Sequence, residues 1–192
     1  RRLRSVALSY LAAAGLGDAP QLAMRQFGSA DNMTDRQGAL RVLADGDSGE
    51  RDGALAAFYD RFRGLDLVID KWFSVQALSE RDDTAEAVEA LARHPDFTLA
   101  NPNRVRALVA AFASNQRALH DPSGRGYRFV ADTILAVDRL NPQTAARLVP
   151  PLGRWRRFDP ARAEKMRAEL ERIAGTAGIS KDVYEQASKS LA

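Results

Sequence analysis

The chain contains no cysteine. This absence excludes a disulfide framework, a thiolate nucleophile and a cysteine-based metal site. Long hydrophobic runs are absent as well, since none approaches the roughly 20 residues that a helix needs to cross a bilayer. No secretory signal peptide is recognisable in the sequence. We therefore expect a cytoplasmic protein with no membrane partner.

A large excess of charge of either sign is also lacking. The 192 residues include 28 Lys and Arg and 25 Asp and Glu, which leaves a net charge of +3. This excess is too small to indicate nucleic-acid binding by itself. Hydrophobic residues make up 45% of the chain, enough for an ordinary globular core. The length fits one domain or one repeat array, which we place over residues 1–192.

The sequence lacks the alternating pattern of β-strands, and nearly every segment has helical periodicity. Three helices are predicted to begin with a capping residue followed by proline: Asn101-Pro102, Asn141-Pro142 and Asp159-Pro160. Val105, Leu108, Val109 and Phe112 then recur at helical spacing. These patterns predict an all-α fold.

The first two of these helix starts lie 40 residues apart, and at that offset Leu108 aligns with Leu148 and Val109 with Val149. A period near 40 built from paired helices is typical of HEAT and armadillo arrays. We therefore predict an array of antiparallel helix pairs that forms a HEAT- or armadillo-like superhelix. An irregular α-bundle is the alternative, because helix-start chemistry alone would produce part of the match.

Two expectations concern the N-terminal part of the chain. The first helix is expected to bury an apolar face formed by Leu3, Ala7, Tyr10, Leu11 and Ala14, and to end at Gly15 and Gly17. The stretch Thr34–Gln37 resembles a capping box and is expected to begin a later helix.

Catalytic and metal-binding patterns are not found. His94 and His120 are 26 residues apart, and neither has a His or Glu partner at the helical spacing of zinc ligands. Both are interpreted as helix-end or surface histidines. Asp66 and Asp70 stand one helical turn apart and are interpreted as a hydrated helix face. We therefore expect no catalytic residue and no metal ligand in this chain.

Arginines cluster around the two Asn-Pro helices and the helix that follows. Their positions are Arg104, Arg106, Arg147, Arg154, Arg156 and Arg157. Arg104 lies in the first turn of its helix, where the helix dipole mildly disfavours a cation. An arginine at this position therefore needs an explanation. These side chains could line a concave surface that meets anionic or carbonyl groups, or they could serve only solubility.

Several motifs resemble the C-terminal domain of the bacterial aminopeptidase N family. They are Asn32-Met33-Thr34-Asp35, Asp70-Lys71-Trp72-Phe73, the stretch F-T-L-A-N-P-N-R-V-R at 97–106, Gly126-Tyr127-Arg128-Phe129, Leu140-Asn141-Pro142-Gln143, A-R-L-V-P-P-L at 146–152 and Glu164-Lys165-Met166-Arg167. The segment before Asn32 departs from the family pattern. The resemblance runs in order along the whole chain.

The resemblance implies a division of labour. The family's zinc motif and catalytic tyrosine belong to an upstream thermolysin-like domain, so these 192 residues are expected to hold no zinc and to have no turnover. The helical domain would pack over the catalytic domain of the same polypeptide and enclose the active site in a chamber that only peptides and small substrates can enter. By position in the motifs, Arg104, Gln143 and Arg147 correspond to residues that face the substrate chamber, whereas Arg106 is expected to be structural.

We therefore interpret the chain as the non-catalytic helical domain of a zinc aminopeptidase, which caps the active-site chamber and positions peptide substrates. The alternative is a free-standing HEAT-like scaffold that binds a protein or nucleic-acid partner through a basic concave face.

Overall fold

The computed structural model describes residues 2–192, and every regular element within them is helical. The first six helices are α1 (Arg2–Ala13), α2 (Ala19–Ser29), α3 (Met33–Asp45), α4 (Glu50–Phe62), α5 (Asp66–Ala77) and α6 (Thr84–Leu91). The others are α7 (Pro102–Val105), α8 (Ala111–Ser114), α9 (Gln116–Leu119), α10 (Arg125–Asp138), α11 (Pro142–Ala146), α12 (Pro160–Ala174) and α13 (Lys181–Leu191). A π-helical turn, Arg106–Ala110, joins α7 to α8, and a 3₁₀ helix, Leu152–Arg157, follows α11.

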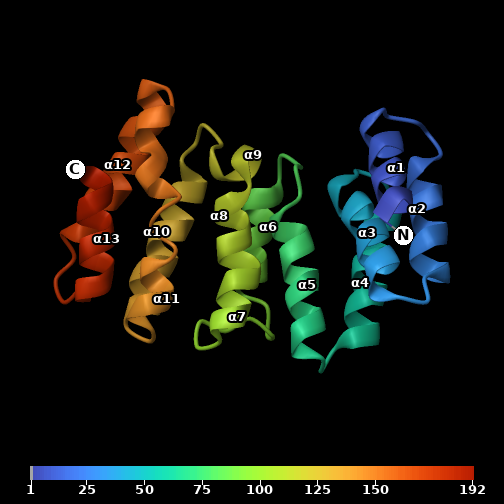
Figure 1. The fold of residues 1–192 in the computed structure, drawn as a ribbon, viewed down its shortest axis with the longest axis horizontal. Helices are drawn as coiled ribbons and strands as arrows, with labels where there is room; N and C mark the ends of the chain where they lie inside the picture. Colours follow the sequence, from blue (N-terminus) through green and yellow to red (C-terminus); the bar gives the residue numbers. More distant parts are fainter. Residues whose placement is uncertain (1) are drawn as a thin grey trace.

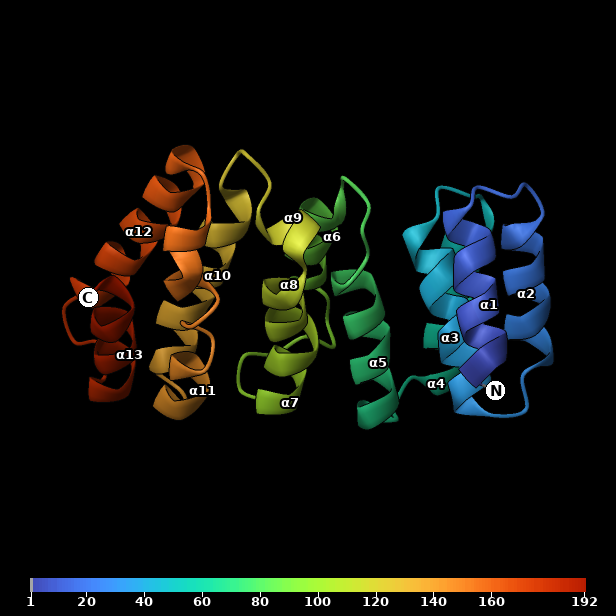
Figure 2. The same cartoon turned by 45° about the horizontal axis from the view of Figure 1, so that its top comes forward.

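The helices stack side by side along one axis, with the two termini at opposite ends of the array (Figure 1). The turned view in Figure 2 shows the same succession. Helices α5, α7, α11 and α13 begin at Asp66, Pro102, Pro142 and Lys181, which are 36 to 40 residues apart. Helix α3 packs on α5, α5 on α7 and the π-helical turn, and α11 on α13. The predicted array of paired helices is therefore confirmed.

The predicted Asn-Pro and Asp-Pro helix starts are present. The Asn101 side chain accepts hydrogen bonds from the amides of Asn103 and Arg104 at the start of α7. Asn141 and Asp159 cap α11 and α12 in the same way. The expectation for Thr34–Gln37 needs correction, because α3 begins at Met33. Its cap is Asn32, whose side chain accepts a hydrogen bond from the Asp35 amide at 2.9 Å.

One hydrophobic core runs through the array from Leu8 in α1 to Ala187 in α13. Its largest fully buried side chains are Tyr127, Phe58, Phe73 and Phe112. Each helix pair contributes to this core only through contact with its neighbours. This arrangement is the structural basis of a helical repeat array.

The expected apolar face of α1 is not the buried one. Leu8 is the buried residue of α1, whereas Leu3 is 80% exposed and Tyr10 is 73% exposed. The helix does end as predicted, with Gly15 in the left-handed region at φ +67°. The difference arises because α1 stands at the end of the array, where α2 and α3 cover only one side of it.

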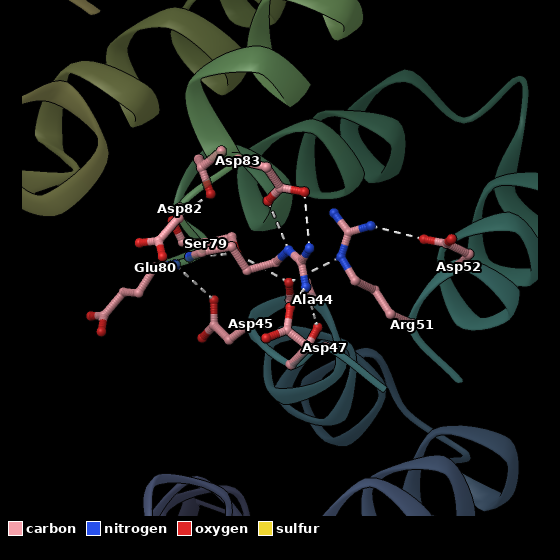
Figure 3. Close-up of polar contacts among 12 residues, drawn as sticks. Ala44, Asp45, Asp47, Arg51, Asp52, Ser79, Glu80, Asp82 and Asp83 are labelled. Atoms are coloured by element: carbon pink, nitrogen blue, oxygen red, sulfur yellow. Dashed lines mark hydrogen bonds and ion pairs between the residues drawn. The ribbon is translucent and has the colours of Figure 1, made fainter. Parts of the chain in front are cut away.

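A polar joint fixes how the first helix pairs stack. Arg81, in the α5–α6 loop, pairs with both carboxylate oxygens of Asp83, contacts Asp47 in the α3–α4 loop and donates to the carbonyl of Gly46 (Figure 3). The Ser79 hydroxyl donates to the Ala44 carbonyl at the end of α3. Hydrophobic burial is not directional, so these contacts set the position of one helix pair against the next.

Gly126, in the first turn of α10, offers a test of the packing. A Cβ at this position would lie 2.7 Å from the Leu119 carbonyl oxygen of α9. We expect Gly126→Ala to destabilise the protein by about 1–3 kcal/mol, the usual cost of overpacking. Exposed Gly53 in α4 has no atom within 4 Å of such a Cβ. The control Gly53→Ala should stabilise by about 0.5–1 kcal/mol, and urea unfolding of both variants measures the contrast.

Candidate functional site

Arg104 is buried rather than solvated, with only 4% of its side chain exposed. Its Nε lies 2.7 Å from Asp70 Oδ1, and Nη2 lies 3.3 Å from Asp66 Oδ1. Nη1 donates to the Asp96 carbonyl at 2.8 Å. The guanidinium carbon lies 5.0 Å from the ring centre of Phe73, within cation–π range. Nη1 and Nη2 therefore donate hydrogen bonds within this chain, whereas Nε has Asp70 as an ion-pair partner without a hydrogen bond to it.

The Asp66–Asp70 pair is the partner that Arg104 needs, so the interpretation of both residues as a hydrated face is wrong for Asp70. Asp70 is 15% exposed, whereas Asp66 remains 81% exposed. Their spacing of one helical turn lets both carboxylates reach one guanidinium across the α5–α7 contact. The carboxylates offset the cost of placing a cation in the first turn of α7.

Gln143 and Arg147 lie one turn apart at α11, and both are exposed. Neither side chain has a hydrogen bond or ion pair with any of residues 2–192. Arg147 lines a pocket of about 230 Å³ between α8 and α11, together with Ser114, Pro151 and Arg154. The structure thus brings Gln143 and Arg147 together and places Arg104 against α5 instead. Helices α7 and α11 begin at the same edge of the array (Figure 1).

The other arginines of the predicted cluster do not form one basic face. Arg106 is exposed and contacts Asn103 within its own helix turn. Arg156 stacks on Trp155 with its guanidinium carbon 4.2 Å from the ring centre, and donates to the Leu191 carbonyl at 2.9 Å. Arg106 and Arg156 are therefore held by contacts within the chain, whereas Arg147 and Arg154 line one pocket.

His120 stands at the C-terminal end of α9, as the helix-end interpretation expects, but it is buried, with 8% exposed. Its Nδ1 lies 3.0 Å from the Tyr127 hydroxyl, and its ring stacks on Phe158 at 3.9 Å between centres. His94 packs in an aromatic group with Tyr59, Trp72 and Phe73. The sequence gives no local sign of the His120–Tyr127 pair beyond the seven-residue separation across a loop.

Among residues 2–192, no three His, Cys, Asp or Glu side chains come together as a metal site. None of the helices in this part of the chain is long and apolar enough to span a bilayer. The donor set of these residues does not fit a bound zinc ion.

The stacked helix pairs and their 36–40-residue spacing place the chain among armadillo-type repeat proteins. A family model described as a domain of unknown function, DUF3458_C, with ARM repeats matches residues 1–192. The chain belongs to this family, which is the C-terminal ARM-repeat domain of bacterial aminopeptidase N.

Three similar proteins are aminopeptidases N from Caulobacter vibrioides, 47% identical, and from Haemophilus influenzae and Escherichia coli, each 41% identical. Each match covers 100% of this chain and 22% of the relative. A crystal structure of Legionella pneumophila aminopeptidase A in complex with aspartic acid matches with a TM-score of 0.93 and 37% identity. It is matched over 100% of this chain and 23% of its own. The chain thus spans about a fifth of these relatives.

The Arg104 cluster yields a stability prediction. We expect Arg104→Leu to destabilise the protein by about 3 kcal/mol, because Asp70 would be left as an unpaired, mostly buried charge. The double variant Arg104→Leu/Asp70→Leu should recover part of that loss. Exposed Arg106→Ala is the control and should change stability by no more than about 0.5 kcal/mol. Equal losses for Arg104→Leu and Arg106→Ala in urea unfolding would contradict the assignment.

Proposed function

We propose that this domain forms a wall of the substrate chamber of a zinc aminopeptidase and positions peptides whose N-terminal residues are removed elsewhere in the polypeptide. Membership of the aminopeptidase N family supports this function. The observation that carries the proposal is the exposed Gln143–Arg147 pair beside a pocket. Both side chains remain free to meet a ligand, unlike Arg104.

The chemistry of the pair suits a peptide chain. The guanidinium of Arg147 can donate two hydrogen bonds to a carboxylate or to peptide carbonyl groups. The Gln143 amide can both donate and accept, which matches the alternating groups of a peptide backbone. The role we assign to them is recognition of the substrate beyond its N-terminal residue.

Arg104 stays a candidate for the chamber by resemblance, and its contacts favour a positioning role. It joins α5, the loop before α7 and α7 itself. We propose that it holds this edge of the wall rigid, so that exposed residues along the edge keep their positions.

Zinc and the hydrolytic step are assigned to the rest of the aminopeptidase polypeptide. The supporting observation is that residues 2–192 offer no group of metal ligands. The 192-residue chain alone should neither bind zinc stoichiometrically nor hydrolyse alanyl amides.

The substrate role can be tested in a full-length aminopeptidase N that carries this domain. We expect Arg147→Ala to raise KM for tripeptides and longer peptides about tenfold with little change in kcat, because a charge-assisted hydrogen bond is worth about 1.5–3 kcal/mol. Gln143→Ala should act in the same direction but less strongly. Small chromogenic alanyl amides, which do not extend beyond the cleaved bond, should be unaffected.

The matched control for this test is Arg167→Ala, since Arg167 is exposed on α12 and pairs with Glu171. It should leave KM for both substrate classes unchanged. Equal losses of Arg147→Ala on peptides and on small amides would contradict a role beyond the cleaved bond.

The exposed stripe of α1 is the surface that we propose for contact with the rest of the aminopeptidase polypeptide. Leu3, Val6 and Tyr10 recur at helical spacing and are 80%, 41% and 73% exposed. The segment from Ser5 to Gly17 carries no charged residue. An uncharged apolar stripe of this kind is typical of an interface, and the relatives are about five times longer than this chain.

This contact predicts a difference between the short chain and the full enzyme. The double variant Leu3→Ser/Tyr10→Ser should change the stability of the 192-residue chain by no more than about 0.5 kcal/mol, since both side chains are exposed in it. In the full-length enzyme the same changes should lower the melting temperature. Tyr184→Ser on α13, where Tyr184 is 53% exposed, is the control. An unchanged full-length melting temperature would contradict the contact.

A further inference from the structure

A second pocket lies at the edge of the array opposite to the start of α7 and α11, beside α9 (Figure 1). Its volume is about 250 Å³. Its polar walls come from the α5–α6 loop, α9, the loop after α9 and α12, and they include Arg81, Asp82, Arg117, His120, Asp121 and Arg162. None of these residues belongs to the proposed substrate face.

His120 is one of the residues that line this pocket, and we infer that its ring supplies a hydrogen-bond donor there. Tyr127 is fully buried, and burial raises the pKa of its hydroxyl to about 12, so the hydroxyl keeps its proton. His120 Nδ1, at 3.0 Å, is the hydrogen-bond partner that the described residues give this buried hydroxyl, so we assign the hydroxyl as the donor and Nδ1 as the acceptor. A neutral His120 that accepts at Nδ1 carries its proton on Nε2. No residue of the described chain is a partner of Nε2.

Two arginines add unused donors to the same pocket. Arg162 donates from Nε to the His120 carbonyl at 2.7 Å and from Nη1 to Asp159 at 2.8 Å, which leaves Nη2 without a partner in residues 2–192. Arg117 contacts Asp82 only through Nη2, at 2.7 Å. Its Nε and Nη1 therefore also remain available.

The third arginine, Arg81, uses four of its five guanidinium N–H groups within the chain. They are held by Asp83, Asp47 and the Gly46 carbonyl, and Figure 3 labels the two aspartates. Arg81 therefore forms a fixed wall of the pocket. The two carboxylates of the lining, Asp82 and Asp121, are each occupied by a donor of this chain, Arg117 and the Ser123 amide.

We propose that this pocket binds a small inorganic oxyanion, phosphate or sulfate, through His120 Nε2, Arg162 and Arg117. A tetrahedral oxyanion has acceptor oxygens in several directions, and these donors come from three different elements around one small volume. The lining around these donors is charged, so the organic group of a phosphate ester would remove water from Asp82 or Asp121 without replacing its hydrogen bonds, and we assign the site to the free ion.

Binding should be linked to the protonation of His120. Burial lowers the His120 pKa, and the charges of Arg162 and Arg154 lower it further. Several elements contribute charged and titratable groups near His120: Tyr127 from α10, Arg154 from the 3₁₀ helix, the α12 cap Asp159, Arg162 from α12, Asp121 from the loop after α9, Arg117 from α9, and Arg81 and Asp82 from the α5–α6 loop. A bound anion stabilises the imidazolium, so it should raise the His120 pKa, and binding should tighten as the pH falls through that pKa.

The test uses sulfate, which does not titrate near neutral pH, and NMR of the histidine ring protons in the 192-residue chain. The chain has only two histidines, so His94 is an internal reference. Sodium sulfate replaces sodium chloride at constant ionic strength. We expect a saturable shift of the His120 signal with a raised pKa, while the His94 signal stays in place.

Variants make the test specific. Arg117→Gln should weaken sulfate binding about tenfold, and it should fold normally because the side chain is 60% exposed. Arg106→Gln is the control: it also removes one positive charge, but outside the pocket, and it should leave sulfate binding unchanged. Inorganic phosphate should compete with sulfate, and glycerol phosphate should bind at least about tenfold more weakly.

Three results would overturn the proposal. The first is the absence of a saturable His120 shift up to about 50 mM sulfate, a concentration far above the dissociation constant expected of a specific site. The second is an equal shift of both histidines, which would indicate a general salt effect. The third is glycerol phosphate binding as tight as phosphate, which would show that the pocket is not restricted to the free ion.

Discussion

Nearest-neighbour burial is the constraint on which this structure depends. No helix of the array can cover its apolar face alone, so each pair depends on the next one, and the core continues without interruption from α1 to α13. Hydrophobic burial stabilises the stack, but it does not fix how one helix pair is oriented against the next. The orientation of the pairs is set by polar contacts between them, of which the Arg81 joint and the Arg104 cluster are the clearest examples.

These polar contacts also show how a chain with a pI near 9.5 uses some of its arginines inside the fold. Arg36 is buried and donates to the carbonyls of Phe27 and Ala30 at the end of α2. Arg81 and Arg104 likewise donate to carbonyls of loops that no helix satisfies. A guanidinium is suited to this use because it stays charged and offers several donors in one plane. These three cations are therefore part of the joints between helices and do not contribute to an external surface.

The sequence predicted the elements better than the site, for a physical reason. Helix starts such as Asn101-Pro102 depend on neighbouring residues, and the 40-residue spacing depends on a periodic core, so both were predictable. The burial of Arg104 depends on Asp70, which is 34 positions away, and the His120–Tyr127 pair depends on how α10 packs on the preceding loop. The exposed stripe of α1 was mistaken for a core face because the periodicity of an apolar stripe does not reveal which surface covers it.

Arg154 links the two candidate sites. It lines the pocket beside Arg147, and its charge also lowers the pKa of His120. Both effects come from one side chain on the 3₁₀ helix that connects α11 to α12. Charges within a Debye length of about 8–10 Å still interact in physiological salt, so an anion bound near His120 would reduce the positive potential that Arg154 adds at the proposed substrate face. On these two proposals, Arg154 would couple the sites electrostatically without a change of shape.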